Sequence, residues 1–190
     1  HGNGGRGVLT NCGKRSALIS VSGVTRQPLT PVKVTAAPAW LHRDKSVEEI
    51  LKRCTELGVT HFAFWRAERS QKAPVEREKW QKILVDSCKQ CGRDRLPELN
   101  VYEDLGSFLD TMPGTLLVAS ESAISPLLTL DPDKAYTMIT GPEGDFSEDE
   151  LAWLRERSVQ WVQLGNYTLR TEVATVALTT LTLNALGRLG

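Results

Sequence analysis

Strand-type segments alternate with helix-type segments from Val32 to the end of the chain. The strand-type segments are short apolar or β-branched runs, at residues 32–37, 59–65, 116–119, 136–140 and 159–164. The helix-type segments place apolar residues every three or four positions, at residues 46–57, 80–91, 147–157 and 171–189. Such alternation favours parallel pairing, because each helix carries the chain back to the start of the next strand. The sequence therefore predicts an α/β domain with a mainly parallel sheet and helices on both faces.

Local signals mark several helix ends. Ser46 with Glu49, and Ser147 with Glu150, match the capping box, in which the two side chains satisfy each other's free backbone N–H groups at a helix start. Gly58 and Gly92 follow the helix patterns over 46–57 and 80–91, where a left-handed residue commonly ends a helix.

Residues 1–31 have a different character, with six glycines among the first 23 residues. They separate short apolar stretches such as 17–21, which predicts turns and short strands. The glycines of residues 2–7 match a dinucleotide-binding loop in spacing, but no helix pattern follows them, so a turn is the better interpretation. We divide the chain into 1–31 and a domain over 32–190, and a chain that begins with His1 is expected to lack an N-terminal piece.

Composition excludes several classes of protein. The 190 residues are 41% hydrophobic and 24% charged, which is sufficient for a sizeable core. The 23 basic and 23 acidic residues balance, so no overall field indicates a nucleic-acid or membrane partner. Apolar runs reach only about five residues, against the roughly 18 that a membrane span needs. We expect no membrane partner.

Cys88 and Cys91 have the spacing of a redox or zinc site, but no second pair of ligands accompanies them. Both fall on the apolar face of the helix pattern over 80–91, where thiols commonly pack as small hydrophobic groups. We expect no metal site and four reduced cysteines, which fits a cytoplasmic location.

Two loop segments are candidates for a functional site. Residues 141–147 and 164–174 each lie between a predicted strand and a predicted helix, and in open parallel sheets ligands bind where such loops gather. Arg170 stands at a helix N-terminus, where the helix dipole disfavours a cation. The structural alternatives are a tight turn for the first segment and a salt bridge to a nearby carboxylate for Arg170.

These two segments resemble the RsmE-like methyltransferases of the SPOUT superfamily. The resemblance rests on Gly-Pro-Glu-Gly at 141–144 and on Leu-Gly and Leu-Arg-Thr-Glu within 164–172. It extends upstream to Glu-Leu-Gly-Val at 56–59, Arg69-Ser70, Trp-Gln-Lys-Ile at 80–83, and 90–93 with Pro97. It implies S-adenosylmethionine-dependent methylation of N3 of a uridine in 16S ribosomal RNA, with ribosomal RNA or the small ribosomal subunit as partner. It also implies a homodimer, a C-terminal trefoil knot, and a truncated PUA-like β-barrel segment at 1–31.

The resemblance implies that backbone groups of three loops, 119–122, 141–145 and 164–169, hold the cofactor. The implied cofactor-binding residues are Ala119, Glu121, Gly141, Pro142, Glu143, Gly144, Leu164, Gly165 and Leu169. The chain departs from the family pattern at three positions: Asp145 replaces a usual Gly, Tyr167 an Arg and Val173 a Thr.

For catalysis, we expect Arg170 to stabilise negative charge that grows on a uracil carbonyl oxygen as N3 loses its proton. Glu172 is the candidate base, or else it orients Arg170. Residues 66–95 hold nine basic and five acidic residues, against one basic and six acidic in 141–156. The candidate phosphate contacts are Arg66, Arg69, Lys72, Arg93 and Arg95. The alternative for these five is an ordinary solvated surface.

Two other functions remain open at this level. The chain could be a SPOUT methyltransferase that acts on another RNA, or a non-catalytic RNA-binding module that kept the fold. Binding of the cofactor separates an enzyme from such a module.

Overall fold

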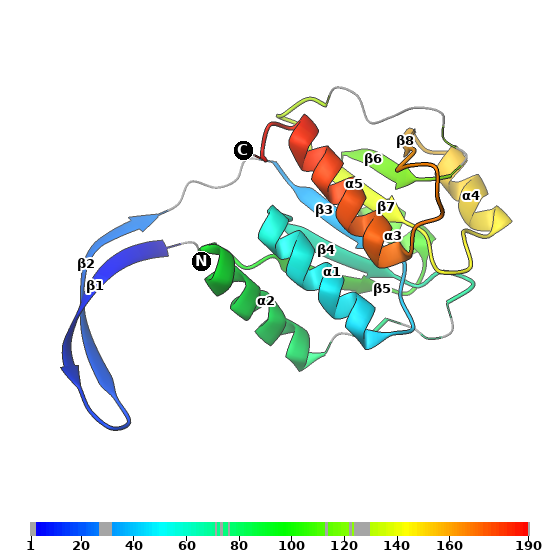
Figure 1. Cartoon of the computed structure of the whole chain (residues 1–190). Helices are drawn as coiled ribbons and strands as arrows, with labels where there is room; N and C mark the ends of the chain where they lie inside the picture. The colour runs from blue at the N-terminus through cyan, green and yellow to red at the C-terminus, as the bar shows by residue number, and fades with distance from the viewer. Residues whose placement is uncertain are drawn as a thin grey trace.

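The structure is a computed structural model that describes residues 3–26, 32–70, 72, 74–75, 77–112, 114–121, 123 and 130–189. Within these residues the chain forms eight strands and five helices, arranged as an N-terminal hairpin and an α/β domain (Figure 1). No helix in the described ranges combines the length and apolar character that a bilayer crossing requires.

The α/β domain is built on a six-stranded sheet in which every neighbouring pair is parallel. Its strands are β3 Val34–Pro38, β4 His61–Trp65, β5 Glu98–Tyr102, β6 Thr115–Ala119, β7 Tyr136–Thr140 and β8 Val159–Val162. They lie in the order β5-β4-β3-β7-β6-β8. The predicted parallel sheet is therefore confirmed, and the two central strands, β3 and β7, are buried along their whole length.

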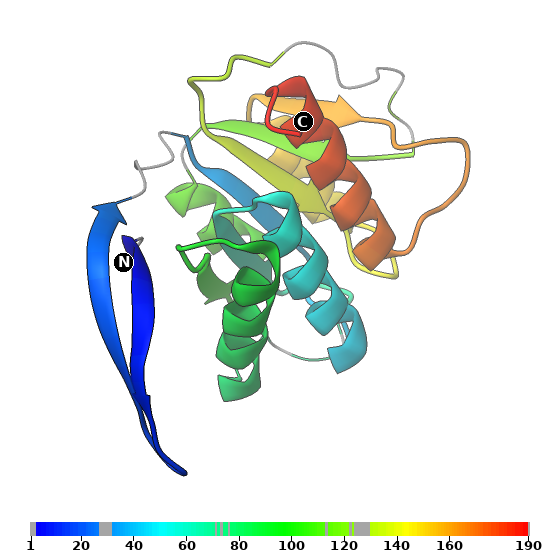
Figure 2. The same ribbon diagram turned by 60° about the vertical axis from the view of Figure 1, so that its left-hand side comes forward.

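Helices cover both faces of this sheet, as predicted (Figure 1 and Figure 2). The helices are α1 Asp44–Leu57, α2 Glu78–Cys91, α3 Leu105–Thr111, α4 Glu148–Arg155 and α5 Thr171–Ala185. Helices α1, α2 and α5 lie on one face, with α1 packed between the other two, and α3 and α4 lie on the opposite face.

The alternation of side chains along each strand supplies a core to each face. In β4, Phe62 and Phe64 enter the core beneath α1, α2 and α5, whereas Trp65 enters the core beneath α3 and α4. In β7, Met138 enters the core beneath α1, α2 and α5, and Ile139 enters the core beneath α3 and α4. Apolar residues at consecutive positions are thus needed in these strands, which is why they read as unbroken apolar runs.

Several predicted helix ends are confirmed. Gly58 and Gly92 end α1 and α2 in left-handed conformations, with φ of 112° and 76°. Both hydrogen bonds of the Ser147–Glu150 capping box are present at the start of α4. Helix α5, however, ends at Ala185 rather than at residue 189, and Gly187 takes a left-handed φ of 66°.

The Ser46–Glu49 capping box is wrong. Helix α1 begins at Asp44, and the N-cap residue is Arg43, whose side chain makes no cap hydrogen bond. The carbonyl of Arg43 accepts from the backbone N–H groups of Ser46 and Val47, so Ser46 already lies inside the first turn.

Two elements were not predicted from the sequence, β5 and α3. Strand β5 is one of the two edge strands and is half exposed, so it has no continuous apolar run. Helix α3 has seven residues, too few to repeat an apolar pattern. Its signal is Asp104, whose carboxylate accepts from the backbone N–H of Ser107 at 2.6 Å and caps the helix.

The N-terminal segment forms a hairpin of two ten-residue strands, β1 Asn3–Cys12 and β2 Ala17–Arg26, longer than the short strands expected. It stands apart from the α/β domain in both views (Figure 1 and Figure 2). Apolar side chains along both strands are more than half exposed, among them Val8, Leu9, Leu18 and Ile19. The glycines from Gly4 to Gly7 lie within β1, so the described part of residues 2–7 is a strand, whereas Gly2 lies outside the described residues.

The four cysteines are unpaired and differ in exposure. Burial raises the pKa of the Cys54 thiol to about 12, and burial also raises the pKa of Cys88, whereas Cys12 is exposed. Because the thiolate is the nucleophile, we expect iodoacetamide at pH 8 to alkylate Cys12 in the folded protein and to leave Cys54 unmodified. Peptide mass mapping checks this, with urea-unfolded protein as the control. Alkylation of both residues at the same rate in the folded protein would contradict the burial of Cys54.

Candidate functional site

The loops that follow β6, β7 and β8 lie at one edge of the sheet, because these three neighbouring strands are parallel and end together. They are the loops at 119–122, 141–147 and 163–170. Ala119 is half-buried and Glu121 exposed at the end of β6, whereas Ser122 lies outside the described residues. The structure thus gathers the three predicted cofactor loops at the carboxyl ends of their strands.

The loop at 141–147 is a tight turn with little spare room. The backbone N–H of Asp145 donates to the carbonyl of Pro142 at 3.1 Å. The Phe146 ring stacks on Trp65, with ring centroids 6.0 Å apart. A Cβ added at Gly141 would lie 2.9 Å from this ring, so the first glycine of the loop is required by internal packing.

Asp145 has a φ of 63°, the only positive φ among the described non-glycine residues. This is the position at which the family pattern has glycine, the residue that adopts such a conformation most readily. The Asp145 carboxylate accepts from the backbone N–H of Phe146 at 2.8 Å, a local bond of the kind that lets aspartate enter the left-handed region.

Helix α5 is tied to this loop by threonines on its buried face. The Thr171 hydroxyl donates to the carbonyl of Gly141 at 2.9 Å. The Thr175 hydroxyl donates to the carbonyl of Thr171 at 2.7 Å and lies 2.8 Å from the Thr140 hydroxyl, which therefore acts as donor to it. The start of α5 and the end of β7 are thus fixed to each other.

Arg170 is the N-cap residue of α5 and is exposed. Within the described residues its guanidinium makes no hydrogen bond and no ion pair, so the structure does not support the alternative of a salt bridge. Glu172 is half-buried in the first turn of α5 and does not pair with Arg170. Tyr167 and Val173, two of the three departures, are 85% and 47% exposed.

The segment at 66–70, which follows β4, is fastened to the loop at 141–147. The Arg69 guanidinium donates from Nη1 to the carbonyl of Gly144 at 2.6 Å. The buried carboxylate of Glu150 accepts from the backbone N–H of Glu68 through Oε1 and from that of Ser147 through Oε2, both at 2.8 Å. The capping-box pattern indicated the Ser147 bond but not the bond to Glu68.

The five basic residues predicted to contact RNA divide into two groups. Arg66, Arg69 and Lys72 are exposed on the segment that follows β4, at the edge where the three loops lie. Arg93 and Arg95 follow the C-terminal end of α2 and are half-buried. The Arg93 guanidinium donates to the carbonyls of Thr55 at 2.6 Å and Val59 at 2.9 Å, so it satisfies carbonyl groups at the C-terminal end of α1. The structure does not bring this pair to the other three.

Beside the loop at 141–147, the charged side chains that line one cavity are mostly acidic. A cavity of about 710 Å³ lies between the segment after β4, the end of β5 and the start of α4. Its lining includes Arg66, Glu103, Asp104, Asp149 and Glu150. No group of three or more His, Cys, Asp or Glu side chains in the described ranges is arranged to hold a metal ion.

Comparison with known proteins identifies the family. A family model described as an RNA methyltransferase domain matches residues 28–183. The ribosomal RNA small subunit methyltransferase E of Helicobacter pylori is 31% identical over 167 residues, which cover 86% of this chain and 72% of that protein. The chain belongs to the RsmE family of ribosomal RNA small subunit methyltransferases. The resemblance found in the sequence is thereby confirmed.

Solved structures of similar proteins share the fold of this RsmE-family chain. A probable rRNA methyltransferase from Porphyromonas gingivalis superposes with a TM-score of 0.84 at 23% identity, over 98% of this chain and 82% of that one. The ribosomal RNA small subunit methyltransferase E of Neisseria gonorrhoeae, bound to S-adenosyl methionine, gives a TM-score of 0.81 at 25% identity. That match covers 96% of this chain and 79% of the other.

We expect side chains added at the two glycines of the 141–147 loop to change the stability of the protein by different amounts. Gly141→Val should lower the free energy of unfolding by about 1–3 kcal/mol, because the new side chain displaces the Phe146 ring. Gly144→Ala should change it by less than about 0.5 kcal/mol, because its Cβ meets Arg69 only at ordinary contact distances of 3.5 and 3.6 Å. Urea denaturation measures both. Equal stability of the two variants would show that Phe146 does not restrict residue 141.

Proposed function

We propose that this chain catalyses the S-adenosylmethionine-dependent methylation of N3 of a uridine in 16S ribosomal RNA. The observation that carries the proposal is the gathering of the loops 119–122, 141–147 and 163–170 at one sheet edge, in a chain of the RsmE family. The Neisseria gonorrhoeae relative, which has this fold, is bound to S-adenosyl methionine.

The residues of the three loops fit such a cofactor. A Cβ built on Gly165 meets no atom within 4 Å, so its backbone is open to a ligand, and half-buried Leu164 and Leu169 flank it with apolar surface. Exposed carboxylates of Glu121 and Glu143 lie on the other two loops and favour a cationic ligand. The proposed contacts are Ala119, Glu121, Gly141, Pro142, Glu143, Gly144, Leu164, Gly165 and Leu169. When bound, S-adenosylmethionine supplies an electrophilic methyl group.

The chain's own contribution to the reaction is charge placement and proton transfer. Uracil N3 becomes a good nucleophile only when its proton leaves and negative charge spreads onto the neighbouring carbonyl oxygens. Arg170 stabilises that charge; its guanidinium is exposed and without partner in the described structure, at a helix end that otherwise disfavours a cation. Glu172, in the first turn of α5, is the proposed acceptor of the proton. The alternative that it orients Arg170 has no contact to support it among the described residues.

The wider architecture belongs to the same proposal. We include a C-terminal trefoil knot in the proposal. Strand β8 lies beside β6, and α5 packs on β3, β7 and α1, an arrangement that is compatible with such a knot. We propose a homodimer, in the cytoplasm, with Arg66, Arg69 and Lys72 contacting RNA phosphates. The same role for Arg93 and Arg95 has less support, since Arg93 already binds two carbonyl groups. The exposed apolar side chains of β1 and β2 support the proposal that 1–31 is part of a larger PUA-like β-barrel.

The proposal is tested by incubating the protein with S-adenosylmethionine labelled in the methyl group and with 16S rRNA, either free or in small ribosomal subunits. We expect label in the RNA and a stop of reverse transcriptase at one uridine, because an N3 methyl group blocks Watson–Crick pairing. Label without a stop at a uridine would instead support a methyltransferase acting elsewhere on RNA.

A non-catalytic RNA-binding module is the second candidate, and it is favoured by Asp145 and Tyr167, which replace a glycine and an arginine of the family pattern. Calorimetry with S-adenosylmethionine separates the two functions. Cofactor binding supports the enzyme, whereas RNA binding without cofactor binding supports the module.

Arg170→Ala should lower kcat by about 100-fold or more, the scale of losing one preorganised charge-stabilising donor, with little change in cofactor affinity. Single-turnover methylation at saturating RNA and cofactor measures the effect, and Arg155→Ala, an exposed arginine of α4, is the control. A lower melting temperature with normal turnover in the Arg170 variant would assign this residue a structural role.

A further inference from the structure

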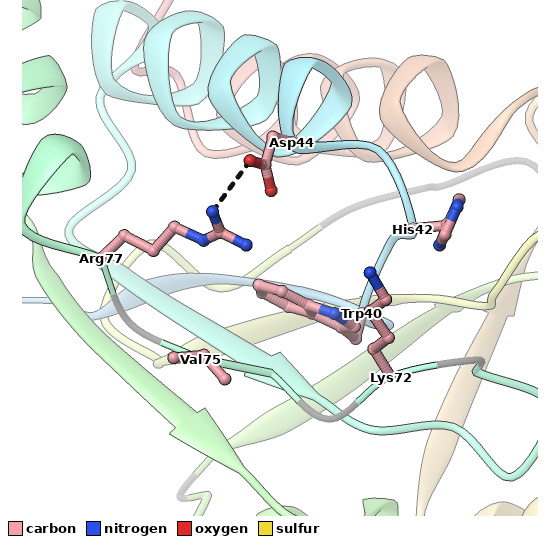
Figure 3. A pocket seen from close by; sticks show the side chains of 6 residues that line it. All are labelled: Trp40, His42, Asp44, Lys72, Val75 and Arg77. Carbon is pink, nitrogen blue, oxygen red and sulfur yellow. Dashed lines mark ion pairs between the residues drawn. The ribbon is translucent and has the colours of Figure 1, made fainter.

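A second cavity, of about 360 Å³, lies on the face of the domain that carries α1 and α2. It is lined by Trp40, His42, Asp44, Lys72, Val75 and Arg77 (Figure 3). These residues come from the connection between β3 and α1 and from the segment that leads into α2. None of them belongs to the three loops proposed to hold the cofactor. The volume falls in the range of about 300–1,000 Å³ typical of small-ligand pockets.

Among the described residues that line the cavity, Lys72 and Arg77 are the cations and Asp44 is the one carboxylate. Asp44 lies 3.1 Å from Arg77 Nη1 and 3.2 Å from Lys79 Nζ. Lys72 is exposed and has no ion pair within the described residues, and it lines the cavity together with Trp40 (Figure 3). Helix α1 begins at Asp44 and α2 directly after Arg77, so two helix N-termini add partial positive charge at the rim.

Trp40 gives the cavity a rigid aromatic floor. It is 6% exposed, and its ring packs against Trp80 and Phe64, with centroids 5.5 and 5.8 Å away. Its backbone N–H donates to the carbonyl of Trp65 at 2.7 Å. On the rim, Val75 is 58% exposed and adds apolar surface.

This combination fits a nucleotide. Cations at the mouth suit a phosphate, and the apolar floor suits a base, the pairing by which proteins commonly hold single-stranded RNA. The cavity is also connected to the candidate site through Arg69 and Ser70. Ser70 donates to the carbonyl of Trp40 at 3.2 Å, while the preceding residue, Arg69, donates to the carbonyl of Gly144.

We propose that this cavity binds one nucleotide of the RNA substrate that flanks the target, with its phosphate at Lys72 and Arg77 and its base against Trp40 and Val75. This inference rests on the proposed function, because that function supplies the RNA that would bind in the cavity. It adds a subsite separate from the loops where the target and cofactor would meet.

Val75→Trp tests the subsite without changing charge, because the larger side chain fills the cavity from an exposed position. Its control is Leu96→Trp, at a residue that is 48% exposed and does not line the cavity. Lys72→Ala tests the phosphate contact, with the exposed Lys82 of α2 changed to Ala as its control. Each variant is titrated with labelled 16S rRNA by filter binding at several salt concentrations, and with S-adenosylmethionine by calorimetry.

We expect Val75→Trp and Lys72→Ala to weaken RNA binding by about 5-fold or more, and Lys72→Ala to lower the salt slope by about one. Both controls should bind RNA as the parent does, and cofactor affinity should be the same in all variants. A Val75→Trp variant that binds RNA like the parent overturns the proposal. Binding of 5′-UMP as tight as that of the RNA, and lost in Val75→Trp, would overturn RNA as the source of the nucleotide.

The outcomes separate this inference from the proposed function. Methylation by the parent together with unchanged RNA binding in Val75→Trp rejects the subsite alone. A parent that methylates no RNA rejects the proposed function, and the RNA titrations still decide whether the cavity is occupied.

Discussion

The parallel pairing of all six strands in the α/β domain is the constraint on which the site depends. Parallel strands require each connection to return across a face of the sheet, so each strand is followed by a loop at the same edge. The loops after β6, β7 and β8 and the basic segment after β4 lie at the same edge of the sheet for this reason, although about 100 residues separate Arg69 from Arg170 along the chain. Hydrogen bonds and packing of side chains then fix the positions of these loops relative to one another.

The loop at 141–147 combines an unfavourable backbone conformation with contacts that stabilise it. Asp145 occupies a left-handed conformation that is disfavoured for residues with a Cβ by about 1–2 kcal/mol. The bond from the Phe146 N–H to the Asp145 carboxylate, the stack of Phe146 on Trp65 and the bond from Thr171 to Gly141 all hold the turn in place. A turn restrained on three sides keeps its backbone positions before any ligand arrives, which lowers the entropy lost on binding.

Sequence reasoning succeeded where a local pattern matched the burial of an element, and it failed where exposure weakened the pattern or a distant partner decided the outcome. The Ser46–Glu49 pattern is an exception, because the local signal is present but α1 begins at Asp44. The buried strands β3 and β7 were predictable because both faces require apolar residues, whereas the half-exposed edge strand β5 shows no such pattern. The gathering of the three loops followed from parallel topology. By contrast, the number of charged residues in a segment does not show that Arg93 donates hydrogen bonds to two carbonyl groups at the end of α1. Nor does it show that the Glu150 carboxylate accepts a hydrogen bond from the backbone N–H of Glu68, 82 residues away.

The shared carboxylate of Glu150 has a thermodynamic consequence. The segment that carries Arg69 and the loop that carries Gly144 are joined by this carboxylate and by the Arg69–Gly144 bond, so separating them breaks these hydrogen bonds. A ligand that shifts one of them changes the conformational equilibrium of both. Linkage then requires reciprocity: the factor by which a ligand of the loop alters affinity at the basic segment equals the factor by which a ligand of the segment alters affinity at the loop. Two binding events at this edge would share a single coupling free energy.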